Sequence, residues 1–591
     1  MGVARLIKYN GGRMSRLLVY VHYHKYNVVS EYIYYQLKSI RSIYSDVVFI
    51  SNSYVSKDVI QYLESERLID FFIQRDNIGY DFAAWKEGLN QVTFYQYDSV
   101  TLMNDTCFGP LWNLEDYYSQ FDSDVDVDFW GMTNHLETKI GSVVVPEHLQ
   151  SYFMVFKKRI LQSQAFVGFW SSVSELTDIQ DVIKLYESQL TKILLSEGYS
   201  YKCVLDTSIC CKNLENRNIT LEYPEVILKN NVPFIKIKSF TEYPDRIYSL
   251  LHLIRMKTKY PVELIERHLR QIIIPGTSFI PQMRVSQTTE TIRSSTSVLL
   301  HIHIESVSIF EEYIEELCKI ADRCQLLITL PEADFSNKCS IVERYLFTYQ
   351  LRAQIVKLTD ELHFFEIVNN YMGDAKYLAH ITVKQTKEIK YSVEDIIDRY
   401  QLRKMFFTLF DAVISNFESQ SNLAVVIPDL TTNQRYDRKS LREGNPELIR
   451  QLNVLYESLA RTKKVDFYKV PYIIGEEVSW YWIKTEHYKK IEEKFRNIDF
   501  SKEDRLLLVP ILFIYSAWDL SNDYAVIENT ENVSPILEKI SFSSERELRL
   551  IIEEQEFLQI GLRRTLKIIS VGIVSVFKMI KKSLLKNRNN G

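Results

Sequence analysis

Residues 69–90, IDFFIQRDNIGYDFAAWKEGLN, contain an apolar run, a turn and a helical pattern in that order. The run at 69–74 is short and largely apolar, as buried strands are, whereas 82–89 has the spacing of a helix. Asn77 and Gly79 stand between them, and a glycine lets the backbone turn sharply and approach a ligand closely. This strand–turn–helix order predicts one unit of a mostly parallel α/β sheet.

The same alternation extends on both sides of this unit. Short apolar runs typical of buried strands alternate with stretches of helical spacing along the N-terminal half of the chain. Parallel strands are covered by helices on both faces, which explains why the runs are nearly all apolar. The predicted strands are 17–22, 46–51, 69–74 and 99–103, and the predicted helices are 28–43, 57–67 and 82–89.

The chain has 591 residues, which is too long for one small module and predicts two large domains or three smaller ones. Residues 276–297 combine Pro and Gly with a Ser/Thr/Gln-rich stretch of little periodicity, which predicts a linker. Residues 1–275 then form a first α/β domain and 298–545 a second one. YVHYH at 20–24 and HIHIE at 301–305 are alike in layout, but one such pair does not establish a repeat. The predicted strands of the second domain are 298–304, 326–330, 377–383 and 423–428, with a helix near 340–351.

Composition and charge exclude several classes of protein. A formal net charge of -5 gives no basic field to hold nucleic acid, and 46% hydrophobic residues exclude overall disorder. The seven cysteines include no CxxC pair, which indicates a reducing compartment rather than a disulfide scaffold or a zinc site. No window reaches the roughly 18 apolar residues that span a bilayer, and residues 1–16 lack the apolar core of a signal peptide. We therefore expect a cytoplasmic protein that binds no nucleic acid.

The C-terminal residues 546–591 differ in composition from the rest. No acid follows Glu556, and the uncharged stretch IISVGIVSVF lies between Lys567 and Lys578. This stretch is too short to span a bilayer, but basic residues on both sides suit an amphipathic helix in a membrane interface. We predict attachment to an anionic membrane surface, and the alternative is a helix that packs on the second domain.

Two acids mark positions where a parallel sheet binds ligands. Asn104, Asp105 and Thr106 follow the fourth predicted strand, and an acid at the carboxyl end of such a strand lies in the ligand crevice. These oxygens suit Mg²⁺ or Mn²⁺, which would neutralise a diphosphate leaving group. The alternative is an Asx turn that only ends the strand. Asp81 opens the third predicted helix as a cap, where free N–H groups also attract an anion, and the alternative is that it only caps.

The order of these signals resembles the inverting family-two type of GT-A glycosyltransferase. That type opens with a strand and a Tyr-Asn pair, and a polar turn follows its second strand. An Asn-x-Gly turn and a strand ending in an Asp-x-Asp motif come next. This chain departs from the pattern in having Asn for the first acid of that motif and Ser-Asn-Ser in the polar turn. The matching residues are Tyr26 and Asn27, then Asn52, then Asn77 and Gly79, then Asn104, Asp105 and Thr106.

A closer resemblance is to rhamnan synthesis protein F, good over about 20–210 and vaguer over 298–530. It implies a GT-A-like first domain that transfers L-rhamnose from dTDP-L-rhamnose to a lipid-linked saccharide acceptor. It also implies a place in the synthesis of rhamnose-rich cell-wall polysaccharide, with other enzymes of that synthesis as partners. The matching blocks are DNIGYDFAAWKEGL at 76–89, LMNDTCFGPL at 102–111, DFWGMT at 128–133 and HLQSYFMVFKKRIL at 148–161.

An inverting transfer needs a general base that takes the proton of the acceptor hydroxyl. In the GT-A resemblance the base stands at a helix start late in the domain, and Glu187 has the matching place in LYESQLTKILLSEGYSY at 185–201. Asp81 is the alternative base, and a third possibility is that neither residue serves. Through the resemblance, Glu187 and Asp81 are the catalytic candidates, and Asp105, Asn104 and Thr106 are the candidate ligands of a divalent metal.

The last block begins with polar and aromatic residues that suit a sugar pocket. We assign His148, Gln150 and Tyr152 to the acceptor or donor-sugar site, and the alternative for Tyr152 is core packing. His301 and His303 of the second domain are expected to be core or crevice histidines rather than metal ligands. The predicted substrate contacts are Tyr26, Asn27, Asn52, Asp76, Asn77, Gly79, His148, Gln150 and Tyr152.

The function predicted from these features is a rhamnosyltransferase on the inner face of the cell membrane. One alternative is a non-catalytic scaffold with a transferase fold that organises the polysaccharide-building enzymes, which the incomplete Asn-Asp-Thr motif favours. Another alternative is a transferase of a different substituent, which would need a different donor site.

Overall fold

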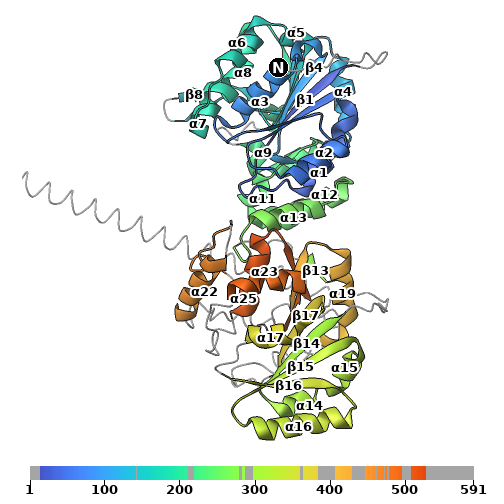
Figure 1. The fold of residues 1–591 in the computed structure, drawn as a ribbon. Coiled ribbons are helices and arrows are strands. Elements are labelled where there is room, and N and C mark those ends of the chain that lie inside the picture. Colours follow the sequence, from blue (N-terminus) through green and yellow to red (C-terminus); the bar gives the residue numbers. More distant parts are fainter. Residues whose placement is uncertain are drawn as a thin grey trace, which may run out of the picture.

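The structure is a computed structural model that contains two mixed eight-stranded sheets, one in each half of the chain (Figure 1). The predicted amphipathic helix within 546–591 lies outside the described residues. No helix in the described ranges is both long and apolar enough to cross a membrane. The described residues are 14–140, 143–210, 218–277, 283–285, 297–359, 364–383, 406–428, 446–459, 462–471, 473–475, 478, 480–495 and 508–527.

The first sheet has the order β3-β2-β1-β4-β10-β6-β11, with the short strand β9 (His148–Leu149) beside β6. Its neighbours are parallel except at β10, which runs antiparallel to β4 and to β6, and at β9, which runs antiparallel to β6. The four predicted strands of this half are all present, at nearly the predicted positions. The strands are β1 (Arg16–His22), β2 (Asp46–Ser51), β3 (Phe71–Gln74), β4 (Ser99–Asn104), β6 (Phe129–His135), β10 (Phe153–Lys157) and β11 (Tyr201–Leu205).

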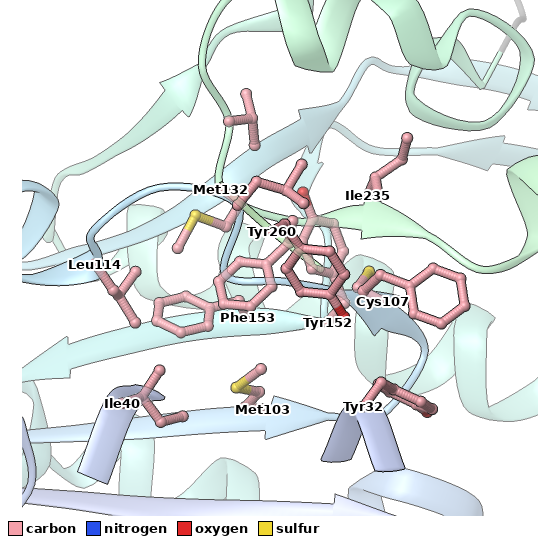
Figure 2. Close-up of a cluster of buried hydrophobic side chains, with 14 of the residues drawn as sticks. Tyr32, Ile40, Met103, Cys107, Leu114, Met132, Tyr152, Phe153, Ile235 and Tyr260 are labelled. Atoms are coloured by element: carbon pink, nitrogen blue, oxygen red, sulfur yellow. The ribbon is translucent and has the colours of Figure 1, made fainter. Parts of the chain in front are cut away.

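Apolar residues of the first sheet alternate between two cores because successive side chains of a strand point to opposite faces. In β1, Leu18 and Tyr20 join the core under α1, α4, α12 and α13, whereas Val19 and Val21 join the core under α3, α6 and α8. Figure 2 shows part of the first core, with Tyr32, Met103 and Phe153 packed together. The helices are α1 (Glu31–Ile40), α2 (Lys57–Ser65), α3 (Tyr80–Gln91), α4 (Leu114–Asp122), α6 (Gln164–Ser172), α8 (Ser188–Ser196), α12 (Ile247–Lys257) and α13 (Glu263–Ile272).

The second sheet has the order β16-β15-β14-β17-β19-β18-β20-β13. Its neighbours are parallel except at β19, which runs antiparallel to β17 and to β18. Strand β13 (Met283–Arg284) lies inside the stretch predicted as a linker. These two residues belong to the second sheet because they pair with β20. The other strands are β14 (Val298–Ile304), β15 (Cys324–Pro331), β16 (Ala353–Leu358), β17 (Tyr377–Val383), β18 (Leu423–Pro428), β19 (Trp480–Lys484) and β20 (Asp523–Ile527).

Helices cover both faces of the second sheet as well (Figure 1). One core lies between the sheet and α17, α22, α23 and α25, and the other between the sheet and α14, α15, α16 and α19. These helices are α14 (Val307–Glu311), α15 (Ile314–Cys318), α16 (Phe335–Thr348), α17 (Phe364–Met372), α19 (Phe410–Ser419), α22 (Pro446–Leu459), α23 (Thr485–Phe495) and α25 (Val509–Asp519).

The two sheets have the same topology. In chain order, β14, β15, β16, β17, β18, β19 and β20 take the places of β1, β2, β3, β4, β6, β10 and β11, with the same strand directions. A matching polar contact fixes the register: His22 Nδ1 lies 2.9 Å from Ser51 Oγ, and His303 Nδ1 lies 2.9 Å from Thr329 Oγ1. His22 is paired with Ser51 across β1 and β2, as His303 is with Thr329 across β14 and β15. The likeness of 20–24 and 301–305 is therefore part of a structural repeat.

Candidate active site

Asp105 lies where the strand order of the first sheet reverses. Strands β2 and β3 lie on one side of β1 while β4 lies on the other, and ligands of α/β sheets bind at the carboxyl ends of the strands at such a point. The Asp105 carboxylate Oδ2 accepts a hydrogen bond of 2.9 Å from the backbone N–H of Tyr23, the residue that follows β1. The hydroxyl of Tyr32 donates to the Asp105 carbonyl over 2.7 Å. The ends of both central strands therefore hold the 9% exposed Asp105 in place.

Asp81 faces the end of β4 from the first turn of α3. The helix is capped by Gly79 and no side chain bonds to its first N–H groups, so the prediction that Asp81 caps the helix is wrong. Instead, Asp81 Oδ2 accepts a 2.8 Å hydrogen bond from the side-chain amide of Asn104. Burial, together with the negative charge of Glu187, raises the pKa of Asp81 to about 6, although the hydrogen bond from Asn104 acts in the opposite direction. Burial and the charge of Asp81 raise the pKa of Asp105 to about 8.

Glu187 approaches the same strand ends from the opposite side of β4. It ends a single π-helical turn, η3 (Ile183–Glu187), and such turns are frequent at functional sites. Its Oε1 accepts hydrogen bonds of 2.8 Å from the hydroxyl and 3.2 Å from the backbone N–H of Ser151, just before β10. The negative charge of Glu187 acts on Asp81 and on His135, which indicates that Glu187 lies near both groups. The two predicted catalytic candidates are therefore near each other, and Asp81 is also near Asp105.

The predicted metal ligands Asn104, Asp105 and Thr106 differ in whether their oxygens are already engaged. The hydroxyl of Thr106 donates to Asn104 Oδ1 over 2.6 Å, so these two oxygens are engaged with each other. The described part of the chain contains no group of three or more acidic, His or Cys side chains placed to hold a metal. Mg²⁺ is commonly held by one or two carboxylates together with phosphate oxygens. Asp105 and Asp81 fit that arrangement, whereas the described residues do not form a complete metal cage.

Polar residues after β2 and β3 form a separate hydrogen-bonded group. The Asn52 amide donates to Asn77 Oδ1 over 3.1 Å, and Arg75 donates to Asn52 Oδ1 over 3.1 Å. Arg75, which sequence reasoning did not single out, is also ion-paired at 3.0 Å with both Glu87 and Glu175, while Asp76 is exposed. The signal for Arg75 was its place directly after a predicted strand. The group fixes the loop that leads into α3.

Gly79 is required by this loop. Its φ is +71°, in the left-handed region that favours glycine. A Cβ at this position would lie 2.5 Å from the Ala83 side chain and 3.0 Å from the Glu175 backbone. The Gly79 N–H donates to the Leu176 carbonyl over 2.8 Å. The glycine thus sets where α3 begins and, through it, where Asp81 stands.

Three predicted substrate contacts are buried. Gln150 Oε1 accepts from Thr133 over 2.7 Å, and the Tyr152 hydroxyl lies 2.8 Å from Thr133 Oγ1. Figure 2 shows Tyr152 among apolar side chains, so its ring packs in the core. The ring of His148 stacks on His135 with centroids 5.3 Å apart. Contact of these residues with a sugar stays a prediction.

Tyr26 and Asn27 follow β1, and Tyr26 contacts the second domain. The ring of Tyr26 packs edge-on against Trp518 of α25 with centroids 6.2 Å apart. Lys463 Nζ lies 4.9 Å from the centre of the Tyr26 ring, so a buried cation of the second domain covers it. Asn27 is exposed, and its Oδ1 accepts from the Tyr54 N–H over 3.2 Å.

Known structures and a curated relative resemble parts of this chain. The uncharacterized protein y4gN of Sinorhizobium fredii is 27% identical over 201 residues, which are 32% of this chain and 49% of that protein. The chain thus spans about half the length of this relative. The mannosyltransferase PcManGT of Pyrobaculum calidifontis is 13% identical, covering 33% of this chain and 55% of its own, with a TM-score of 0.23. The apo-form glycosyltransferase GlyE of Streptococcus pneumoniae is 11% identical, covering 64% and 93%, with a TM-score of 0.24.

A family match extends over most of the chain. The family described as rhamnan synthesis protein F matches residues 47–521, which include the Asn77–Gly79 turn, Asp105, Glu187 and most of the second sheet. A match over well more than half of the residues is sufficient to establish membership. The chain therefore belongs to the rhamnan synthesis protein F family.

Proposed function

We propose that the first domain is a glycosyltransferase of rhamnan synthesis that takes its sugar from a nucleoside diphosphate. The observation that carries the proposal is the place of Asp105 at the strand-order reversal of the first sheet, with Asp81 hydrogen-bonded to the preceding Asn104 and Glu187 near Asp81. Membership of the rhamnan synthesis protein F family supports dTDP-L-rhamnose as donor and a lipid-linked saccharide as acceptor. Other enzymes of the same polysaccharide synthesis are its proposed partners.

The proposed reaction inverts the configuration of the transferred sugar. Glu187 takes the proton of an acceptor hydroxyl, whose oxygen bonds to the anomeric carbon. The bond from that carbon to the diphosphate oxygen breaks on the opposite face, and its electron pair stays on the diphosphate. Ser151 orients Glu187 through its two hydrogen bonds. Asp81 is the alternative base, since its pKa of about 6 is close to neutrality, where a general base is most effective.

A divalent Mg²⁺ or Mn²⁺ ion fits the pair of Asp105 and Asp81, with donor phosphates completing its ligands. Such an ion would neutralise charge on the diphosphate. Asn104 orients Asp81 by its amide hydrogen bond, and Tyr23 orients Asp105. The ordering of both acids therefore does not depend on the ion.

A scaffold without activity is the second candidate function. It is favoured by the single acid of the Asn-Asp-Thr motif and by the pKa of about 8 of Asp105, which leaves that carboxyl largely neutral at pH 7 in the empty site. Slow hydrolysis of dTDP-L-rhamnose by the purified chain without acceptor would support the transferase. If the chain neither hydrolyses nor binds dTDP-L-rhamnose, UDP-sugars or GDP-sugars, the scaffold function is favoured. Turnover of a donor of another substituent would favour the third alternative.

The membrane association proposed for this protein depends on residues 557–591. The basic residues of this segment and its Ile/Val/Phe stretch suit reversible attachment to anionic lipid, at about 1 kcal/mol for each basic residue near the surface. A chain ending at Glu556 should float poorly with anionic liposomes, while the intact chain should float and be released by salt. Salt-insensitive flotation would indicate apolar insertion, and no flotation of the intact chain would exclude attachment.

A further inference from the structure

Lys236 is a cation at the candidate active site that the sequence did not single out. It belongs to the short strand β12 (Ile235–Lys236), which pairs antiparallel with β5 (Cys107–Phe108) so that Lys236 stands opposite Cys107. The next residue, Ile237, donates its N–H to the Thr106 carbonyl over 2.9 Å. A two-stranded ribbon therefore fixes Lys236 beside the strand end that carries Asp105.

The surroundings of Lys236 are those of the site itself. Its Nζ lies 5.6 Å from the centre of the Tyr152 ring, next to the Ser151 that holds Glu187. Burial lowers the pKa of Lys236, while the negative charge of Glu187 acts in the opposite direction. The positive charge of Lys236 also contributes to lowering the pKa of His135. The ammonium group therefore shares the site with Glu187.

Lys236 differs from the buried lysines Lys463 and Lys484 in lacking a polar partner. Lys463 donates to the carbonyls of Gln271 and Trp518, and Lys484 donates to those of Gln420 and Ser421. Within the described ranges, Lys236 makes no hydrogen bond or ion pair, and its ammonium group lies over the Tyr152 ring. The Lys236 side chain is partly exposed, so an anion in the site can reach its ammonium group. A lysine without an acceptor among the described residues is available to pair with such an anion.

We propose that Lys236 binds the diphosphate of the nucleotide-sugar donor and neutralises it as the sugar leaves. This inference rests on the proposed transferase function and assigns a residue to its leaving-group site. The other ionisable groups at this edge include the acids Asp81, Asp105 and Glu187, whose ionised carboxylates repel a diphosphate unless a positive charge faces it. When the bond from the anomeric carbon to the phosphate oxygen breaks, the electron pair stays on the diphosphate. The acceptor proton goes to the carboxylate base, and Lys236 keeps its own proton throughout.

The test compares a diphosphate with its nucleoside. Binding of dTDP and of thymidine to the full chain is measured by calorimetry for the parent, Lys236→Met, Lys236→Arg and the control Lys238→Met. Lys238 lies two residues further on with a 72% exposed side chain, so its loss removes a nearby surface charge and a surface ion pair with Glu242. We expect Lys236→Met to weaken dTDP at least about tenfold, as for loss of a charged hydrogen bond, and to leave thymidine unchanged. Lys236→Arg should retain most of the dTDP affinity, and Lys238→Met all of it.

The outcomes separate this inference from the function on which it rests. If the parent binds dTDP and Lys236→Met binds it equally well, or loses dTDP and thymidine alike, the assignment of Lys236 is overturned while the transferase stands. If the parent binds neither dTDP, UDP nor GDP, the proposed function fails and the inference fails with it. If the parent binds UDP or GDP but not dTDP, the same variants are compared with that nucleoside diphosphate and its nucleoside. Circular dichroism checks folding, and Lys236→Gln replaces Lys236→Met if the latter does not fold.

Discussion

The two sheets share their topology but differ at the strand ends where ligands would bind. Pairing of Val21 with Asn104 in the first sheet corresponds to pairing of Ile302 with Ile381 in the second, because His22 and His303 are equivalent. The residue after Asn104 is the acid Asp105, and its counterpart after Ile381 is Thr382. The repeated feature is thus the scaffold, and the carboxylate belongs to one copy.

Neutral imidazoles lie at the corresponding edge of the second sheet, beside the Thr382 that stands in place of Asp105. His380 Nδ1 lies 3.0 Å from His301 Nδ1, and His380 Nε2 lies 3.1 Å from Thr382 Oγ1. Burial lowers the pKa of His380 to about 3 and that of His301 well below its usual value. These rings are therefore uncharged at neutral pH, as the prediction of core or crevice histidines requires. A sheet can thus keep its strand order while the acid at its ligand edge is replaced by threonine.

The largest expected difference comes from equivalent substitutions at the two edges. Asp105→Ala should lower transfer at least about 10²-fold, as removal of an electrostatic stabiliser does, because it deletes the acid at the strand-order reversal. Thr382→Ala changes the counterpart and should leave transfer within twofold of the parent. Initial rates with dTDP-L-rhamnose and a soluble acceptor measure both, with thermal melts to check folding. A comparable loss in Thr382→Ala would place chemistry in the second domain.

Replacing Glu187 tests the proposed general base of the first domain. Glu187→Gln keeps size and hydrogen bonding but removes the base, and should lower turnover about 10²–10⁴-fold with nucleotide binding retained. Glu197→Gln is the control, since Glu197 is exposed at the end of α8 and should have no effect. Turnover and nucleotide affinity are measured for both. Parent-level turnover of Glu187→Gln, with loss in Asp81→Asn, would transfer the role of base to Asp81.

A pH series tests the charge difference through stability. The folded chain keeps a proton on Asp105 up to a pKa of about 8, whereas the unfolded chain loses it near 3.8. Between these values the native state binds more protons, so the free energy of unfolding falls as pH rises. Asp105→Asn removes this cost and should melt above the parent at pH 8, by about 2–4 °C for each kcal/mol regained in domains of 150–250 residues. The two should converge near pH 4, and parallel melting curves at all pH values would contradict the raised pKa.

The smallest effect concerns the contact that both copies share. Ser51→Ala and Thr329→Val each remove the hydroxyl that meets a buried histidine, and should cost about 1–3 kcal/mol of stability. Thr329 contacts both His301 and His303, so its loss should cost more. Urea unfolding followed by fluorescence measures the change, and transfer by Thr329→Val should stay at the parent rate. Equal costs would mean that the second imidazole contact contributes nothing.

Strands with unbroken apolar runs were predictable and their pairing was not. The observed β2, β14, β17 and β18 coincide with predicted ranges because each is buried on both faces. The antiparallel strands β10 and β19 and the repeat itself were not predicted, since strand direction and order depend on contacts distant in sequence. The sequence placed Asp105 after the fourth strand and Asp81 at the start of the third helix, and the folded chain brings Asp81 to the end of β4 through its hydrogen bond with Asn104. Lys236 lies more than a hundred residues after Asp105 and has no local motif, so only the folded ribbon brings it to the site.

The loop after β1 links the two copies mechanically. Its first residue, Tyr23, holds Asp105 by a backbone hydrogen bond, and Tyr26 packs against Trp518 of the second domain. Three residues span at most about 10 Å of backbone, too little to absorb a large displacement. A rotation of the second domain that moves Trp518 therefore pulls on the N–H that positions Asp105. The second copy has no acid of its own at this place, but its movement would shift the position of Asp105 in the first copy.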